Sequence, residues 1–205
     1  MTLEEKNQND ILDELNDPND IEFIFSDKPI NRFKTKPEVE DKIALLTKLK
    51  NDLQNIKNCE LKESAKKLVF SDGNSNSRIM IVGEGPGQKE DEVGKPFVGD
   101  AGLLLNKMLK AININRQDIY ITNVVNYRPP NNRKPEPAEI TRYSEYLRKH
   151  ISIINPKILI LMGSTAMESL FGSKIKISKE RGNWKQVIIN NKTYLTMITF
   201  HLSLI

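Results

Sequence analysis

The sequence predicts an α/β fold: a three-layer α/β/α domain built around a four-stranded parallel sheet. Four short apolar segments have the length and β-branched content of buried strands, and helical patterns separate them. These segments are 79–82, 118–123, 157–162 and 194–200. A glycine-rich loop follows the first of them directly. The alternation of strands and helices favours a parallel sheet that carries helices on both faces.

Helical patterns precede and separate the predicted strands. From residue 37, apolar residues recur at three- and four-residue steps and predict a helix that packs through one face. This stripe comprises Val39, Ile43, Leu46, Leu49, Leu53 and Ile56. Further helices are expected over 101–109, from 137 to 153 and over 164–172. Residues 182–192 are typical of a hairpin, with Asn190 and Asn191 in its turn.

Length and composition indicate one globular domain with an appendage. The 205 residues suffice for a sizeable core, and no apolar run approaches the ~20 residues that a membrane-spanning helix needs. The polar, acidic N-terminus shows no secretory signal. The single cysteine, Cys59, rules out an intramolecular disulfide and fits a reducing compartment. We therefore expect a cytoplasmic protein that makes no membrane contact.

Charge divides the chain into two parts. Residues 1–40 hold eleven acidic and five basic side chains, whereas 41–205 hold sixteen acidic and twenty-six basic ones. We predict an acidic, flexible N-terminal segment over 1–37 and a folded domain over 38–205. A basic domain suits a polyanion such as DNA. A lysine-rich composition without functional meaning is the alternative.

The loop after the first predicted strand is the candidate site. Gly83, Gly85 and Gly87 alternate with other residues, which lets the backbone approach a ligand without Cβ clashes. Glu84 lies within this turn, and Phe97 follows between two further glycines. The spacing matches neither the dinucleotide fingerprint nor a Walker loop. A carboxylate and an aromatic ring on such a loop predict a pocket for a flat polar ligand, with a plain tight turn as the alternative.

Four segments in one order resemble the motifs of the family 4 uracil-DNA glycosylases, within the uracil-DNA glycosylase superfamily. They are GEGPGQKEDEVGKPFVGDAGLLL (83–105), ITNVVNYRPPNNRKPEP (121–137), PKILILMGSTA (156–166) and FHLS (200–203). The resemblance covers roughly residue 53 to the C-terminus. It implies a DNA repair enzyme that flips uracil out of DNA and hydrolyses its N-glycosidic bond, leaving an abasic site.

The resemblance also assigns roles to single residues. Phe97 would stack on the flipped uracil, and Asn123 would hydrogen-bond its O4 and N3–H. His201 would stabilise negative charge on the leaving base, and Glu84 would orient water or stabilise the sugar. Backbone contacts to the substrate are expected from Gly83, Gly85 and Gly87. The alternatives are a core phenylalanine, an asparagine in a turn and a structural histidine.

Contacts to DNA are expected from basic and hydroxyl side chains near the same edge of the sheet. They are Lys95, Arg128, Arg133, Ser164 and Arg181, with Lys134 and Lys185 as further candidates. Ser164 and Thr165 follow Gly163 at a helix start, where backbone N–H groups bind phosphate. Solvated surface charges and an ordinary helix cap are the alternatives.

In the resembling family, four cysteines hold an iron–sulfur cluster, and only Cys59 remains here. The other three ligand positions are Ile56, Tyr127 and Tyr143. A [4Fe–4S] cluster normally needs four thiolates. We therefore expect no cofactor and no metal, with Cys59 acting as a small buried hydrophobic residue.

The last motif also departs from the family pattern, which is H-P-S followed by a leucine-rich wedge and a final helix. Leu202 replaces the proline, Ser203 is kept, and the sequence stops at Ile205. Without a wedge, the cost of unstacking a base from a duplex is less compensated. Uracil in single-stranded DNA is therefore the expected substrate.

Two alternatives compete with a monomeric, nucleoid-associated glycosylase. A degenerate family member would bind DNA or uracil without turnover. An adaptor would use residues 1–37 to recruit a repair or replication protein, and the fold would then serve only as a scaffold.

Overall fold

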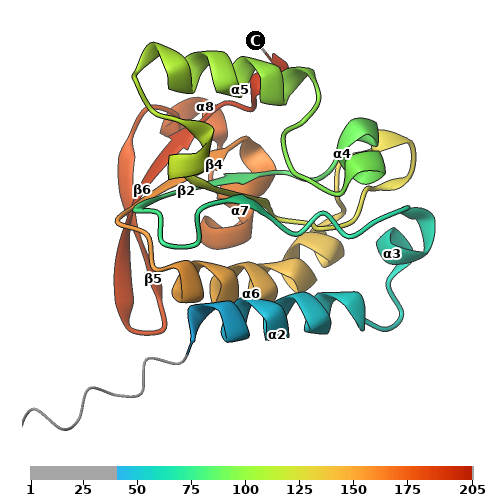
Figure 1. Cartoon of the computed structure of the whole chain (residues 1–205). Helices are drawn as coiled ribbons and strands as arrows, with labels where there is room; N and C mark the ends of the chain where they lie inside the picture. Colours follow the sequence, from blue (N-terminus) through green and yellow to red (C-terminus); the bar gives the residue numbers. More distant parts are fainter. Residues whose placement is uncertain (1–40, 205) are drawn as a thin grey trace, which may run out of the picture. The chain divides into compact units, whose positions relative to one another are not determined.

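A computed structural model describes residues 41–204, and the predicted acidic segment 1–37 lies outside them (Figure 1). Six strands form one sheet in the order β1-β3-β2-β4-β6-β5. Four of them run parallel: β2 (Ile79–Gly83), β3 (Tyr120–Asn123), β4 (Ile158–Met162) and β6 (Lys192–Thr199). The predicted parallel sheet is thus confirmed.

Two antiparallel strands extend this sheet at its edges. β1 (Asp72–Gly73) pairs with β3, and β5 (Trp184–Ile189) pairs with β6. The predicted hairpin is β5–β6, and it turns at Asn190 and Asn191, which have φ angles of 49° and 59°. Asparagine tolerates this left-handed conformation, which two-residue hairpin turns require. β1 was not predicted, because Asp-Gly carries no strand propensity.

Helices cover both faces of the sheet, as predicted (Figure 1). α2 (Lys42–Gln54), α6 (Pro137–Ile154) and α7 (Ser164–Phe171) lie on one face, and α5 (Asp100–Ala111) lies on the other. The remaining turns of helix are α3 (Glu60–Ser64), α4 (Gln88–Val93), α8 (Ile177–Glu180), η1 (Arg116–Asp118), η2 (Pro130–Asn132) and η3 (Leu202–Leu204). No helix within 41–204 is long and apolar enough to cross a membrane.

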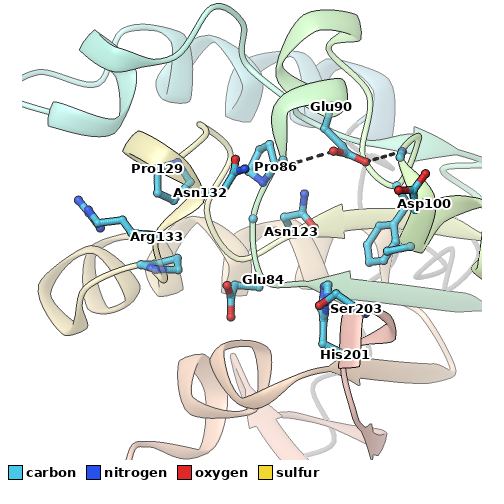
Figure 2. A pocket seen from close by; sticks show the side chains of 16 residues that line it. Glu84, Pro86, Glu90, Asp100, Asn123, Pro129, Asn132, Arg133, His201 and Ser203 are labelled. Carbon is cyan, nitrogen blue, oxygen red and sulfur yellow. Dashed lines mark hydrogen bonds between the residues drawn. The ribbon is translucent and has the colours of Figure 1, made fainter. Parts of the chain in front are cut away.

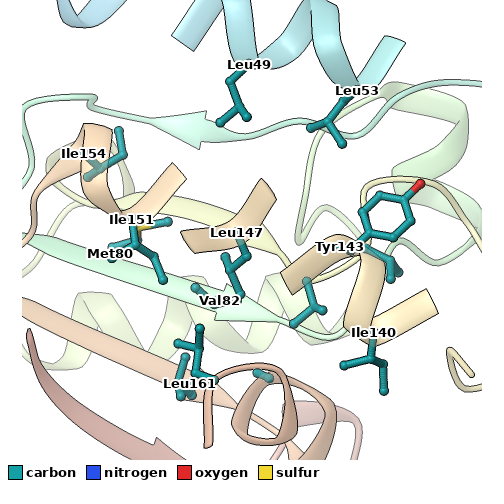
Figure 3. Packing of buried hydrophobic residues seen from close by; sticks show 14 of the residues in the cluster. Leu49, Leu53, Met80, Val82, Ile140, Tyr143, Leu147, Ile151, Ile154 and Leu161 are labelled. Carbon is teal, nitrogen blue, oxygen red and sulfur yellow. The ribbon is translucent and has the colours of Figure 1, made fainter. Parts of the chain in front are cut away.

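The larger core lies between the sheet and the helices α2, α6 and α7 (Figure 3). Met80 and Val82 of β2 pack on this side, whereas Ile81 between them faces α5. Successive strand residues point to opposite faces, and both faces are covered, so β2 is apolar without interruption. The stripe predicted for α2 is partly right: Leu49 and Leu53 are buried, but Ile43 is 67% exposed.

A second core joins α5 to the C-terminal segment. Leu105 and Leu109 of α5 pack with Ile81 of β2 and with Leu202 of η3. Leu202, which replaces the family's proline, is only 4% exposed. The four parallel strands end at one edge of the sheet, the usual ligand side of an open α/β sheet. The loop after β2 and the segment after β6 therefore meet at that edge.

Candidate active site

A cavity of about 290 Å³ opens at the carboxyl edge of the sheet (Figure 2). Six of the predicted catalytic and substrate-binding residues line it: Glu84, Gly85, Gly87, Phe97, Asn123 and His201. They come from the loop after β2, the segment before α5, the end of β3 and the segment after β6. Residues more than one hundred positions apart in sequence therefore share one cavity.

Gly83, the seventh predicted residue, lies behind the cavity rather than in its lining. A Cβ atom there would lie 2.5 Å from Asn123 Oδ1 and 2.6 Å from Phe97 Cε2. Such distances are shorter than van der Waals contact, so any side chain at this position would displace both groups. Gly83 thus permits Asn123 and Phe97 to approach each other across the end of β2.

Phe97 is buried, at 6% exposure, in the segment between α4 and α5. Its φ angle is 52°, a left-handed conformation that is uncommon for a bulky residue. A Cβ on Gly102 would lie 1.9 Å from the Phe97 carbonyl oxygen, so α5 approaches the loop there only because it carries a glycine. The Phe97 ring centroid lies 6.1 Å from that of His201, and the two rings are tilted by 32°.

Asn123 ends β3 directly beside Gly83. Asn123 is only 3% exposed. Among the described residues its side-chain amide makes no hydrogen bond, and every fully buried side-chain nitrogen or oxygen has a partner, so the amide atoms of Asn123 are not fully buried. The amide is therefore directed at the cavity, with both its N–H groups and its oxygen available. An amide can donate to a carbonyl and accept from an imide N–H at the same time.

His201 presents a neutral imidazole to the cavity. Burial lowers the pKa of its ring, and the charges of Glu84 and Glu90 oppose this only in part. The backbone N–H of Ser203 donates to Nδ1 at 3.3 Å, and the Ser203 hydroxyl lies 2.8 Å from the same atom. Because Nδ1 accepts, the ring proton is assigned to Nε2. His201 can thus donate an Nε2–H hydrogen bond to a ligand.

Glu84 is held by the first turn of α7. The Thr165 hydroxyl donates to Glu84 Oε2 at 2.5 Å, and Thr165 is fully buried. The Thr165 hydroxyl thereby orients the carboxylate, whereas a phosphate contact through the backbone N–H groups of Ser164 and Thr165 stays a prediction. A fixed carboxylate next to the cavity can accept a proton from water or stabilise positive charge.

Arg133 is the one predicted DNA-binding residue that lines the cavity. Both of its terminal nitrogens donate to Glu139, at 2.8 and 2.7 Å, and this pairing raises the pKa of the guanidinium. Arg133 therefore fixes the start of α6, and its charge is largely matched by Glu139.

The other predicted DNA contacts lie outside the lining and have protein partners. Lys95 pairs with Asp72 at 3.6 Å, Arg128 donates to Asn132, Lys134 donates to Ser164, Lys185 pairs with Glu180, and Arg181 lies over the Phe200 ring. These partners neither support nor exclude DNA contact, so that role stays a prediction.

Sequence reasoning missed the residues that support the site. Glu90 and Arg116 bond to the loop that carries Phe97, and Ser203 bonds to His201. Glu90 lies in the 83–105 motif but within an acidic run, and Arg116 lies in a polar turn outside every motif, so neither stands out from its neighbours in the sequence. Ser203 had one, because it belongs to the FHLS motif.

Comparisons with known proteins identify the family of this chain. The model of the Uracil DNA glycosylase superfamily matches residues 70–205. The type-4 uracil-DNA glycosylase of Thermotoga maritima is 46% identical over 126 residues, or 61% of this chain and 66% of that protein. That of Sulfurisphaera tokodaii is 41% identical over 165 residues, covering 76% and 73%. That of Archaeoglobus fulgidus is 40% identical over 120 residues, covering 58% and 60%.

Two of these three relatives are thus matched over less than two thirds of their own length.

The comparisons nevertheless confirm the resemblance to the family 4 uracil-DNA glycosylases, and they correct the prediction that no cofactor is present. The single cysteine predicts no cofactor, but the relatives are type-4 proteins, the type for which the resemblance implies an iron–sulfur cluster. The family therefore implies a cluster for this chain as well.

The residues at the four cluster positions do not fit a thiolate-held cluster. Cys59 Sγ lies 3.3 Å from the Tyr143 hydroxyl, and the Tyr127 hydroxyl donates to the Leu53 carbonyl at 3.2 Å. Burial raises the pKa of both phenols, so they stay protonated rather than anionic. Residues 41–204 contain no group of three or more His, Cys, Asp or Glu side chains placed to hold a metal.

Proposed function

Because the chain belongs to the uracil DNA glycosylase superfamily, in its type-4 branch, we propose that it removes uracil from DNA by hydrolysing the N-glycosidic bond. One observation carries this proposal: Glu84, Phe97, Asn123 and His201 converge on a single cavity at the carboxyl edge of the sheet. These are the four positions to which the family resemblance gives chemical roles.

The size and lining of the cavity suit one flipped base. Its volume of about 290 Å³ is at the lower end for ligand pockets, which favours a small ring over a larger ligand. Phe97 offers an aromatic surface for stacking, and the Asn123 amide matches the O4 acceptor and the N3–H donor of uracil. A base inside a duplex is inaccessible, so uracil must leave the stack to be bound.

Bond cleavage then depends on His201 and Glu84. The C1′–N1 bond breaks with both electrons leaving on the uracil ring, so negative charge develops at N1 and O2. The Nε2–H of His201 donates to O2 and stabilises that charge, a kind of contact worth about 10²–10³ in kcat. Water forms the new bond to C1′ on the opposite face, and its proton passes to the Glu84 carboxylate. The uracil anion then takes up one proton from water and Glu84 returns its proton to water, so the products are free uracil and an abasic sugar.

The preferred form of the substrate is part of the proposal. Single-stranded DNA offers uracil without the cost of opening a base pair, and the basic balance of residues 41–205 supports binding to a phosphate backbone. We propose that the chain acts on it as a monomer, in the cytoplasm where the nucleoid lies.

The decisive experiment incubates the purified chain with a single-stranded oligonucleotide that contains one uracil. Alkali then cleaves the strand at any abasic site. We expect cleavage by the wild-type chain and a loss of about 100-fold or more in His201→Ala. An oligonucleotide with thymine in place of uracil is the matched substrate control. A folded chain that binds the uracil strand but releases no uracil would overturn the proposal and favour a binding protein without turnover.

A further inference from the structure

Two opposite charges hold four consecutive residues around Phe97 through their backbone. On one side, Glu90 Oε1 accepts the N–H groups of Val98 at 2.9 Å and Gly99 at 2.7 Å. On the other side, the Arg116 guanidinium donates to the carbonyl oxygens of Pro96 at 2.7 Å and Phe97 at 3.0 Å. The two residues come from α4 and η1, and neither is a neighbour of this segment in sequence.

Each charge is itself fixed by further contacts. The second oxygen of Glu90 accepts the N–H of Gly87 at 3.2 Å, which ties the glycine loop to the Phe97 segment. Figure 2 shows the hydrogen bonds that Glu90 accepts from Gly87 and Gly99 as dashed lines. Arg116 Nε donates to Asp72 Oδ2 at 2.8 Å, and the side chains of Arg116 and Asp72 are only 17% and 15% exposed. Charge-assisted hydrogen bonds shielded in this way are stronger than neutral ones.

The Phe97 segment needs such support because its backbone is strained. With φ at 52°, Phe97 adopts a conformation that bulky residues avoid. Conformations of this kind persist only where the surroundings over-determine them, and they gather at functional sites. The carbonyl of Phe97 itself is one of the groups that Arg116 holds.

We propose that Glu90 and Arg116 are positioning residues that hold the Phe97 ring in place as the stacking surface for the flipped base. The inference rests on the proposed function, because it takes that base as the partner of Phe97. Both residues act through the backbone of 96–99 and need not touch the base. Asp72 supports them, since it orients Arg116. We call Glu90, Arg116 and Asp72 together the Phe97 clamp.

The first test compares Arg116→Met with Arg142→Met. Arg142 is a matched control: it also donates to two consecutive carbonyls, those of Lys57 and Asn58, and Asn58 also has a positive φ of 50°, but none of these residues lines the cavity. We expect Arg116→Met to lower the kcat of uracil release by about tenfold or more, with KM for the oligonucleotide changed less than about twofold. Arg142→Met should leave both constants within about twofold. Equal losses in the two variants would overturn the proposal.

The second test asks whether Arg116 acts through Phe97. Residues that act through one another give non-additive effects in a double-mutant cycle. In a Phe97→Ala background we expect Arg116→Met to change kcat by less than about twofold, although it still lowers the melting temperature. A further tenfold loss in that background would show that Arg116 acts by another route.

A third measurement does not depend on activity. Amide hydrogen exchange should become at least about tenfold faster at Val98 and Gly99 in Glu90→Gln and in Arg116→Met. The exchange rates of the Lys66 and Lys67 amides, which donate to Asp91, should not change.

If the wild-type chain releases no uracil, the proposed function fails, and the amide exchange rates still decide whether the Phe97 clamp exists. Should Arg116→Met not fold, Arg116→Lys keeps the charge facing Asp72 but cannot bridge two carbonyls. Unchanged exchange at Val98 and Gly99 would refute the clamp.

Discussion

Thr165 offers a sharp test of the role proposed for Glu84. Its hydroxyl donates to Glu84 Oε2 at 2.5 Å from a fully buried position, and valine has almost the same shape without the donor. A hydrogen bond to a charged group contributes about 1.5–3 kcal/mol, which corresponds to roughly 10- to 150-fold in rate if the whole contact orients the carboxylate. We therefore expect Thr165→Val to lower kcat by roughly that factor.

Thr165→Ser is the matched control, because it restores the donor and removes only one methyl group. Its cost is about 1 kcal/mol of stability, with kcat within about threefold of the wild type. The assay is single-turnover release of uracil from a single-stranded oligonucleotide, with melting temperatures measured on the same samples. In a Glu84→Gln background, Thr165→Val should have little further effect. Equal rates for the valine and serine variants would refute the reasoning, because the donor would then be irrelevant.

Single contacts elsewhere in the domain give three more predictions. Gly83→Ala places a methyl group 2.5 Å from Asn123 Oδ1, so uracil release should fall about 100-fold; an unchanged rate would contradict this. Ser203→Ala removes the hydroxyl 2.8 Å from His201 Nδ1 but keeps the backbone donor, so kcat should fall only about two- to tenfold. Burial lowers the pKa of His150 from 6.5 to about 3. The unfolded chain therefore binds more protons between these values, and stability falls as pH drops through that window. His150→Phe should flatten this fall in melting temperature, and an unchanged slope would exclude His150 as its source.

The elements that could be predicted from sequence are those whose cause is local. β2 and β4 are continuous apolar runs because both faces of the sheet are covered, and such runs are recognisable without a partner. The β5–β6 turn is set by Asn190 and Asn191. β1 was missed because Asp-Gly has no strand propensity, so its pairing with β3 comes from the tertiary fold.

The candidate site divides in the same way. Residues that meet the cavity stood in motifs, so the family resemblance located them. Three of their supports, Glu90, Thr165 and Ser203, also lie within those motifs, but the motifs do not show which atoms these side chains hold; Thr165, for example, is 81 positions from Glu84. Arg116 and Asp72 lie outside every motif and are 44 positions apart. No periodicity or local spacing encodes such a pair. Charged residues in polar turns are usually solvated, and only packing reveals that Arg116 holds two carbonyl groups.

Leu202 belongs both to a sequence motif and to the packing that supports the site. In the sequence, leucine in place of the family's proline is a departure from the motif. In the structure, the Leu202 side chain is only 4% exposed and belongs to the same core cluster as Phe97 and Leu105. Its packing anchors the residue directly after His201, while Ser203 fixes the imidazole from the other side. Three of the four groups at the cavity therefore have a hydrogen-bonded support: Arg116 and Glu90 for Phe97, Thr165 for Glu84, and Ser203 for His201. The proposed activity then depends on these contacts as well as on the residues that line the cavity.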